Sequence, residues 1–253
     1  MAGTILHRSK IPIQEWFWAA YLVATHTPGI SARQLQRQLG VSSYETAWYL
    51  LQRLRKGMVN DTRTPLAGLI EADETIIGGP ATGKKGRGVT QSVHNSLVIG
   101  AIEVLRYVAK NGMGKEKAGR LRLKWITHAD TKTIRQFLKD NVAPGASVRT
   151  DGWRGYSQTA LSGYDHTVHV QGVSEQAHQL APHIHRVFSN LKTWLQETHH
   201  GVGRKYLQGY LDEYVFRFNR RQTPMAAFQT LLGITATKKP IGLWAIQQPE
   251  STG

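Results

Sequence analysis

Acidic residues gather at one point of this chain, where three of them occupy four positions: Glu71, Asp73 and Glu74. The surrounding residues, LAGLI before and TIIGG after, are mostly apolar and predict a β-strand that carries Asp73. A second strand-like segment ends at Asp151, 78 residues after Asp73. Two carboxylates that meet in the fold can share divalent cations and support in-line phosphoryl displacement. This pair therefore predicts a metal-dependent site for phosphoryl transfer.

A third metal ligand is expected from the helix predicted over 185–200. Asn190 offers a carbonyl oxygen at the border of the apolar stripe of that helix. Glu197 lies within about 20° of the same stripe, but about 10.5 Å farther along the helix axis, so the two cannot serve the same ion without distortion. Asn190 is favoured, and Glu197 remains the alternative. The predicted catalytic and metal-binding set is Asp73, Asp151 and Asn190, with Mg²⁺ as the ion and Mn²⁺ as a substitute.

Two further residues are accessory candidates near this site. Strand alternation puts Glu71 and Asp73 on one face and Glu74 on the other, so Glu74 is expected to fix a Lys or a backbone group. His185 is expected to approach the metal site. Because the chain has no Cys and its histidines are irregularly spaced, no zinc is expected.

The chain is strongly basic, which favours a polyanionic partner. Its 32 Lys+Arg and 17 Asp+Glu give a net charge of +15, and the pI is about 10.2. Such a surplus is typical of proteins that bind nucleic acid by neutralising phosphates. The cationic loop residues expected to contact DNA are Lys84, Lys85 and Arg87. No apolar run approaches the ~18 residues of a membrane span, and no secretory signal is visible, so a cytoplasmic protein without a membrane partner is predicted.

The first 65 residues predict helices arranged to bind DNA. Ser31 is expected to cap a helix over 32–39, and Ser42 or Ser43 to cap a second one that runs to about Met58. A helix, a short glycine turn and a longer helix form the helix-turn-helix pattern that places its second helix in the major groove. The basic residues of this second helix expected to contact DNA are Arg53, Arg55 and Lys56.

The period of the sequence changes after residue 65. Strands are expected near 66–79, from 97 and from 120, with a Gly/Lys turn at 110–119 between the second and the third. A helix over 131–142 and a strand over 146–153 are expected to follow. This order predicts an α/β (α+β) fold with an RNase H-like mixed sheet flanked by helices. In that topology the first and fourth strands are neighbours, which would bring Asp73 and Asp151 together. The predicted domains are 1–65 (helix-turn-helix region), 66–235 (catalytic domain) and 236–253 (tail).

Four motifs resemble the catalytic core of the ISXO-like insertion-sequence transposases: ADETIIGG (72–79), TDGWRGY (150–156), HRVFSNLKTWLQETHHGV (185–202) and KYLQGYLDEYVFRFNRR (205–221). The resemblance implies a DDE-type enzyme whose third acid is often Asn, so that Asp73, Asp151 and Asn190 take the triad positions. A Lys is also part of the family signature, and Lys192 is the local candidate. It lies about 160° from Asn190 on a helical wheel, which favours a contact to DNA phosphate. Arg154, in the second motif, is also expected to contact DNA.

The resemblance implies a bacterial, nucleoid-associated transposase that cleaves element ends and joins the freed 3′-hydroxyl to target DNA. Its partners would be the terminal inverted repeats, the target DNA and at least one further copy of the chain. Family members usually begin with a Cys-rich zinc ribbon, so a chain with no Cys resembles a shortened member. The alternatives are an inactive DNA-binding remnant or repressor, and a structure-selective nuclease of the same fold.

Overall fold

The computed structural model describes residues 2–7, 9–59, 63–78, 95–150, 155–157, 160–168, 181–240, 242 and 246. Apart from the last two residues, the chain divides into two compact units: unit 1 is Met1–Arg63 with Thr193–Ser251, and unit 2 is Thr64–Lys192. The first division lies beside the domain boundary predicted after residue 65. The second falls within a helix, and the residues after it group with the N-terminal helices. None of the described helices is long and apolar enough to cross a membrane.

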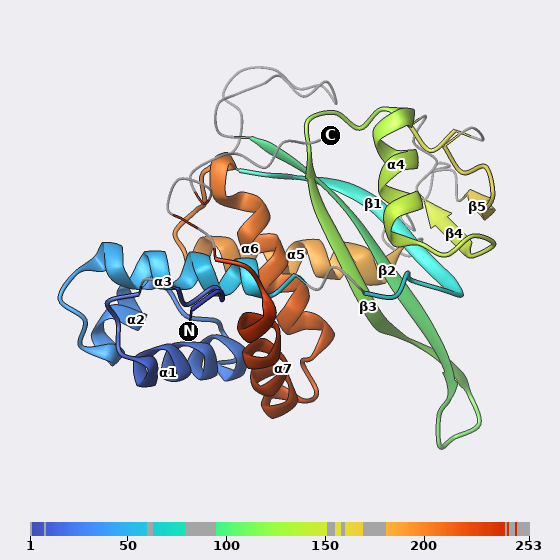
Figure 1. Cartoon of the computed structure of the whole chain (residues 1–253). Coiled ribbons are helices and arrows are strands. Elements are labelled where there is room, and N and C mark those ends of the chain that lie inside the picture. The colour runs from blue at the N-terminus through green and yellow to red at the C-terminus, as the bar shows by residue number, and fades with distance from the viewer. Residues whose placement is uncertain are drawn as a thin grey trace. The chain divides into compact units, whose positions relative to one another are not determined.

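Unit 1 is helical. Its complete helices are α1 (Ile13–Thr25), α2 (Ala32–Leu39), α3 (Tyr44–Gly57), α6 (Arg204–Asn219) and α7 (Pro224–Thr237) (Figure 1). The hydroxyl of Ser31 accepts a hydrogen bond from the backbone N–H of Gln34 at 3.2 Å, and that of Ser43 from Glu45 at 3.1 Å. Gly40 ends α2 with a φ of 66°, a left-handed conformation that suits glycine. These residues bound α2 and the start of α3 on either side of a short turn.

The second half of α3 is buried inside unit 1, contrary to the expectation that its basic residues face DNA. Arg53 is 6% exposed and Arg55 is 1% exposed. The Nε of Arg55 lies 2.8 Å from a carboxylate oxygen of Glu213, and its guanidinium carbon lies 3.6 Å from the centroid of the Tyr210 ring. Arg55 therefore has a structural role. Lys56, which is half-buried, is the least enclosed of the three predicted DNA contacts on this helix.

Unit 2 contains a mixed five-stranded sheet with the order β3-β2-β1-β4-β5. The strands are β1 (Leu69–Ile77), β2 (Ser96–Val108), β3 (Gly114–Ile126), β4 (Ser147–Thr150) and β5 (Asp165–Val168). The first three strands pair antiparallel, whereas β4 pairs parallel to both β1 and β5. The predicted RNase H-like order is thus confirmed, including the pairing of the first strand with the fourth.

Each face of the sheet is covered differently. The apolar residues Ile70 and Ala72 of β1 share a core cluster with Phe137 of α4 (Thr131–Asn141). The alternate residues of β1 point to the other face, which carries the first part of α5 (Pro182–Glu197; residues 182–192 belong to unit 2). Gly100 of β2 permits this approach, because a Cβ there would lie 3.0 Å from the side chains of both Ile184 and Phe188.

Strands β2 and β3 continue beyond the edge of the sheet. The last pair between β1 and β2 joins Leu69 to Val104, and after it β2 pairs only with β3 as far as Val108 and Gly114. Residues 105–117 thus form a two-stranded ribbon, which extends past the other strands of unit 2 in Figure 1. The sequence predicted a Gly/Lys turn over 110–119, but β3 already begins at Gly114. At the root of the ribbon, the Nε of Arg120 donates a hydrogen bond of 2.8 Å to Glu103.

Candidate functional site

Glu71 ties the start of α5 to the centre of the sheet. Its side chain is fully buried, and its Oε2 accepts hydrogen bonds from the backbone N–H groups of His183 at 2.8 Å and Ile184 at 3.0 Å. These N–H groups belong to the first turn of a helix and have no partner within it, and the helix dipole favours an anion there. Glu71 therefore acts as a cap for α5, supplied by a strand far away in the sequence.

This cap sets the position of Asp73, two residues farther along the same face of β1. The Oδ2 of Asp73 lies 2.9 Å from the Nε2 of His185, and its Oδ1 accepts a hydrogen bond of 2.8 Å from the backbone N–H of Glu74. Asp73 is only 9% exposed, whereas His185 is partly open to solvent. The carboxylate is held in a fixed orientation, and each oxygen still has a lone pair for another partner.

A second group beside Asp73 has ligand atoms suited to a cation. Glu71, Glu116 and His183 each offer one ligand atom, and the three atoms lie within 4.8 Å of one another. The Oε1 of Glu71 is buried and has no hydrogen-bond partner among the described residues. Burial raises the pKa of Glu71, against the opposing effect of the N–H groups of Ile184 and His183 and of the nearby Arg149. Two carboxylates and an imidazole suit a divalent ion, and the nitrogen favours Mn²⁺ over Mg²⁺.

Two arginines share Glu116 at the margin of this group. The guanidinium of Arg149 on β4 lies 3.3 Å from both carboxylate oxygens of Glu116, and the Nε of Arg106 lies 3.2 Å from one of them. Partial burial acts to raise the pKa of Glu116, but the two arginines outweigh it and the pKa is lowered. Glu116 therefore stays ionised at neutral pH and keeps both arginines near the site.

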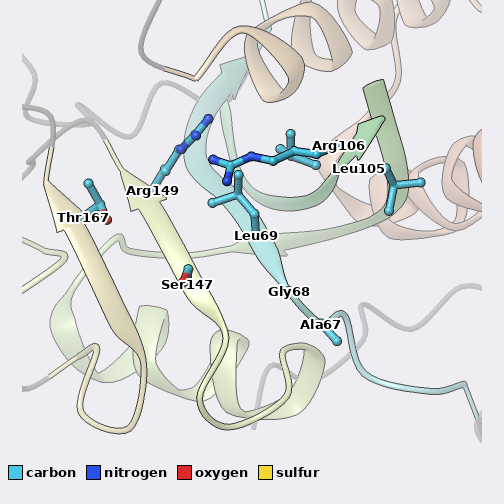
Figure 2. Close-up of a pocket in the computed structure, with 9 residues that line it drawn as sticks. Ala67, Gly68, Leu69, Leu105, Arg106, Ser147, Arg149 and Thr167 are labelled. Carbon is cyan, nitrogen blue, oxygen red and sulfur yellow. The ribbon is translucent and has the colours of Figure 1, made fainter. Parts of the chain in front are cut away.

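An open groove adjoins the arginines on the same face of the sheet. Its volume is about 740 Å³, and its polar lining includes Arg106, Arg149, Ser147 and Thr167. Figure 2 shows Arg106 and Arg149 extending toward one another above β1 and β4, with the hydroxyl-bearing residues on β4 and β5. Guanidinium and hydroxyl groups are the usual donors to phosphate oxygens, so this groove suits a phosphodiester backbone.

The sequence was compared with known proteins. Residues 65–219 match the family model described as the ISXO2-like transposase domain. The chain belongs to the ISXO2-like transposase family. No curated protein matches the chain. The family is one of DNA transposases, so the chain is in broad terms a DNA-processing enzyme that binds DNA and uses divalent metal.

The predicted site residues of the transposase differ in their contacts and in their exposure to solvent. Asp73 and His185 are in contact, and Glu74 lies half-buried on the opposite face of β1. Asn190, Lys192 and Glu197 are exposed on α5. Five predicted residues lie outside the described part of the chain: Asp151, Lys84, Lys85, Arg87 and Arg154.

Helical geometry separates two of the exposed residues of α5. Starting from His185, which contacts Asp73, Asn190 lies about 140° around the helix, whereas Lys192 lies within about 20° and about 10.5 Å farther along. Lys192 is thus on the side of α5 that faces Asp73. Asn190 lies closer to the opposite side of the helix, so its role as a ligand beside Asp73 stays a prediction from the sequence.

The sequence of the transposase did not assign a role in this site to Glu71, Arg149 or Glu116. Glu71 was placed on the face of Asp73 by strand alternation, and the same alternation would have placed Arg149 on the face of Asp151. Glu116 gave no such signal, because it reaches the site through the pairing of β2 with β3.

Proposed function

We propose that this protein is the transposase of an insertion sequence, which cleaves DNA at the element ends and joins the freed 3′-hydroxyl to target DNA. Asp73, Asp151 and Asn190 would hold the divalent ions, as predicted. When bound, such ions activate the attacking oxygen and stabilise the leaving oxygen of an in-line displacement. Water attacks in the first step and the 3′-hydroxyl in the second, and no covalent bond to the enzyme forms.

The register of β1 and β4 carries this proposal. Each Cα pair between the two strands joins residues 78 positions apart, from Leu69 and Ser147 to Glu71 and Arg149. Asp73 and Asp151 are separated by the same 78 positions, and strand alternation assigns them the face of Glu71 and Arg149. A parallel pair of strands that continued this register would supply two carboxylates to one ion site.

The described residues are suited to support that site. His185 orients the carboxylate of Asp73 by its hydrogen bond at 2.9 Å, and Glu71 fixes the helix from which His185 extends. Substitution of a residue that orients a metal ligand commonly lowers metal affinity or activity by about 10- to 100-fold. Arg149 and Lys192 would bind phosphates on either side of the scissile bond. The three-ligand group of Glu71, Glu116 and His183 competes as a holder of the metal.

A strand-transfer assay tests the proposal. The full chain would be incubated with labelled DNA that carries the element end and with a plasmid target, in Mg²⁺, Mn²⁺ or EDTA. We expect metal-dependent joined products that disappear with Asp73→Asn and with Asp151→Asn. Asp140→Asn is the matched control, because Asp140 is an exposed acid on α4, and it should join DNA at the wild-type rate. Glu116→Gln reports on the competing group, because Glu116 belongs to it without capping α5: a shift in the Mn²⁺ concentration for half-maximal rate would favour that group as the holder of the metal.

Two other outcomes would each replace the proposal. DNA binding without nicking or joining in any metal would indicate a transposase remnant or repressor. Cleaved products that are never joined would indicate a nuclease. Asp73→Asn distinguishes these two outcomes. The substitution should leave the DNA binding of a remnant or repressor unchanged, and it should abolish cleavage by a nuclease.

A further inference from the structure

The β2–β3 ribbon, residues 105–117, exposes apolar side chains that the described residues of unit 2 leave uncovered. Four of its residues are among the exposed large apolar residues of the described chain: Leu105 at 43%, Tyr107 at 43%, Val108 at 74% and Met113 at 57%. A two-stranded ribbon has no sheet on either side to bury such residues and is only marginally stable alone. Their exposure therefore points to a surface that covers them in the working complex.

The charge of the ribbon indicates what that surface is. It carries four basic residues, Arg106, Lys110, Lys115 and Lys117, and one acidic residue, Glu116. The three lysines are exposed, and the acid is already shared with Arg106 and Arg149. A surplus of cations beside exposed apolar groups complements a duplex, whose phosphates border grooves with stacked bases.

We propose that the ribbon is an arm that enters a groove of duplex DNA. Its lysines would contact phosphates, while its tip, with Val108 and Met113, would approach the bases. This inference rests on the DNA substrate of the proposed function and adds a binding element remote from Asp73. The arm would grip DNA outside the cleavage site and add to affinity without taking part in the chemistry.

The pairing of the ribbon separates its two faces. Leu105 lies opposite Lys117 and Tyr107 opposite Lys115, so these four side chains share one face. The ammonium of Lys117 lies 5.4 Å from the centroid of the Tyr107 ring. The other face carries Arg106 and Glu116, which lead toward the groove beside Arg149. Phosphate contacts from the lysine face and the groove would therefore lie on opposite sides of one arm.

The dimensions of the ribbon fit a DNA groove. Four residues of β2 extend past Val104, which at about 3.4 Å per residue gives a length of roughly 14 Å before the turn. The major groove is about 8.5 Å deep and about 12 Å wide, and it admits a two-stranded ribbon. The root of the arm is tied to the sheet by Glu103 with Arg120 and by Glu116 with Arg149.

A second copy of the chain fits this surface less well. Packing two such faces against each other would oppose the lysines of one copy to those of the other, and like charges across strands are destabilising. Lysines on an edge strand also serve simply to block pairing with other strands. That simpler role predicts no change in DNA binding when the lysines are replaced, so the two accounts can be separated.

The salt dependence of DNA binding tests the proposal. Affinity of the full chain for a labelled duplex would be measured over a range of KCl for the wild type and for Lys115→Gln/Lys117→Gln. Each lost phosphate contact reduces the slope of log K against log salt by about 0.9, so the double variant should lose about 1.8 and bind roughly tenfold or more weakly at ~0.1 M salt. Lys132→Gln/Lys139→Gln, on the exposed side of α4, removes the same charge and should keep the wild-type slope.

The tip requires a variant of its own. Val108→Ser/Met113→Ser should weaken binding several-fold at an unchanged slope, because it removes apolar contacts and no charge. An unchanged slope in the lysine variant would overturn the proposal, as would sedimentation showing that this variant only loses dimers. Asp73→Asn separates the two hypotheses, because it should keep the wild-type slope. If it still joined DNA while the lysine variant lost slope, the catalytic assignment would fail and the arm would stand.

Discussion

Each unit of the protein contains an arginine–glutamate pair, and the two pairs differ in their access to solvent. In unit 1, Arg55 and Glu213 have side chains that are 1% and 0% exposed, and their closest atoms are 2.8 Å apart. In unit 2, Arg149 and Glu116 are 21% and 30% exposed, with a separation of 3.3 Å. The first pair is enclosed by other residues of the same unit. The second pair keeps a groove beside it and can exchange partners when a phosphate or a cation arrives.

The difference shows why basic residues of one sequence have unlike roles. A charge removed from water must be matched inside the fold, and Arg55 is matched by Glu213 and the face of Tyr210. A charge at a half-open margin loses less hydration and remains available to a ligand. Burial thus separates structural cations from binding cations, although both types contribute equally to the net charge.

The largest effect is expected at the half-open site. Asp73→Asn keeps the size of the side chain but removes its charge, so strand transfer should fall on the order of a thousandfold or more. Stability should change by less than about 1 kcal/mol, because the Asn still bonds to the N–H of Glu74. Rates of joining and urea unfolding of the same preparation measure the two quantities. Joining near the wild-type rate would place the chemistry elsewhere on the chain.

The buried pair should show the reverse pattern. Glu213→Ala leaves the guanidinium of Arg55 buried without its anion, which typically costs about 3–5 kcal/mol of folding free energy. Glu116→Ala is the matched change at the half-open pair and should cost under about 1 kcal/mol. Urea unfolding monitored by tryptophan fluorescence would compare them. Equal losses in the two variants would contradict the distinction drawn between the pairs.

The sequence was sufficient for features that depend on near neighbours. Ser31 and Gly40 bound α2 at the predicted residues, and Ser43, one of two predicted caps, starts α3. Apolar spacing located α4 within a residue, and the order of strands and helices predicted the sheet. Strand alternation also put Glu71 and Asp73 on one face of β1, where both contact α5.

Features that depend on distant partners were beyond the sequence. Arg55 was expected to contact DNA. Its partner in the fold, Glu213, is 158 positions away, so no local pattern in the sequence indicated the pair. A turn was expected over 110–119, because the glycines and lysines there have weak β-propensity and only the pairing of β3 with β2 overrides it. Helix α7 was not predicted as a separate element, although Pro224 at its start is a typical helix signal. Glu71 was known to share a face with Asp73, but its capping of α5 required the fold.

A packing change beneath the site should have an intermediate effect. Gly100→Ala would place a Cβ 2.9 Å from Leu123 and 3.0 Å from Ile184, so α5 would have to move away from the sheet. We expect a loss of about 1–3 kcal/mol in stability and a fall in strand transfer, because His185 would move away from Asp73. Gly233→Ala on α7 is the control, since nothing lies within 4 Å of its added Cβ. Full activity in Gly100→Ala would show that the site tolerates a displaced α5.

The smallest effect is a pH dependence within unit 1, where two half-buried groups, His199 and Asp212, act in opposite directions. Burial lowers the pKa of His199 to about 4, so below pH 6.5 the unfolded chain binds a proton that the folded chain refuses, and stability falls. Burial raises the pKa of Asp212 to about 6, so the folded chain takes up a proton first as the pH drops, and stability rises. Between about pH 7 and about pH 5.5 the two effects should nearly cancel.

Replacing one of the two groups should reveal the other. Asp212→Asn removes the gain, so stability should drop by about 1 kcal/mol between about pH 7 and about pH 5.5, because only His199 then titrates. His199→Gln should show the opposite slope. Tryptophan fluorescence during urea unfolding is suitable, because five of the seven tryptophans lie in unit 1. Parallel pH profiles in the two variants would mean that burial shifts the pKa of neither His199 nor Asp212.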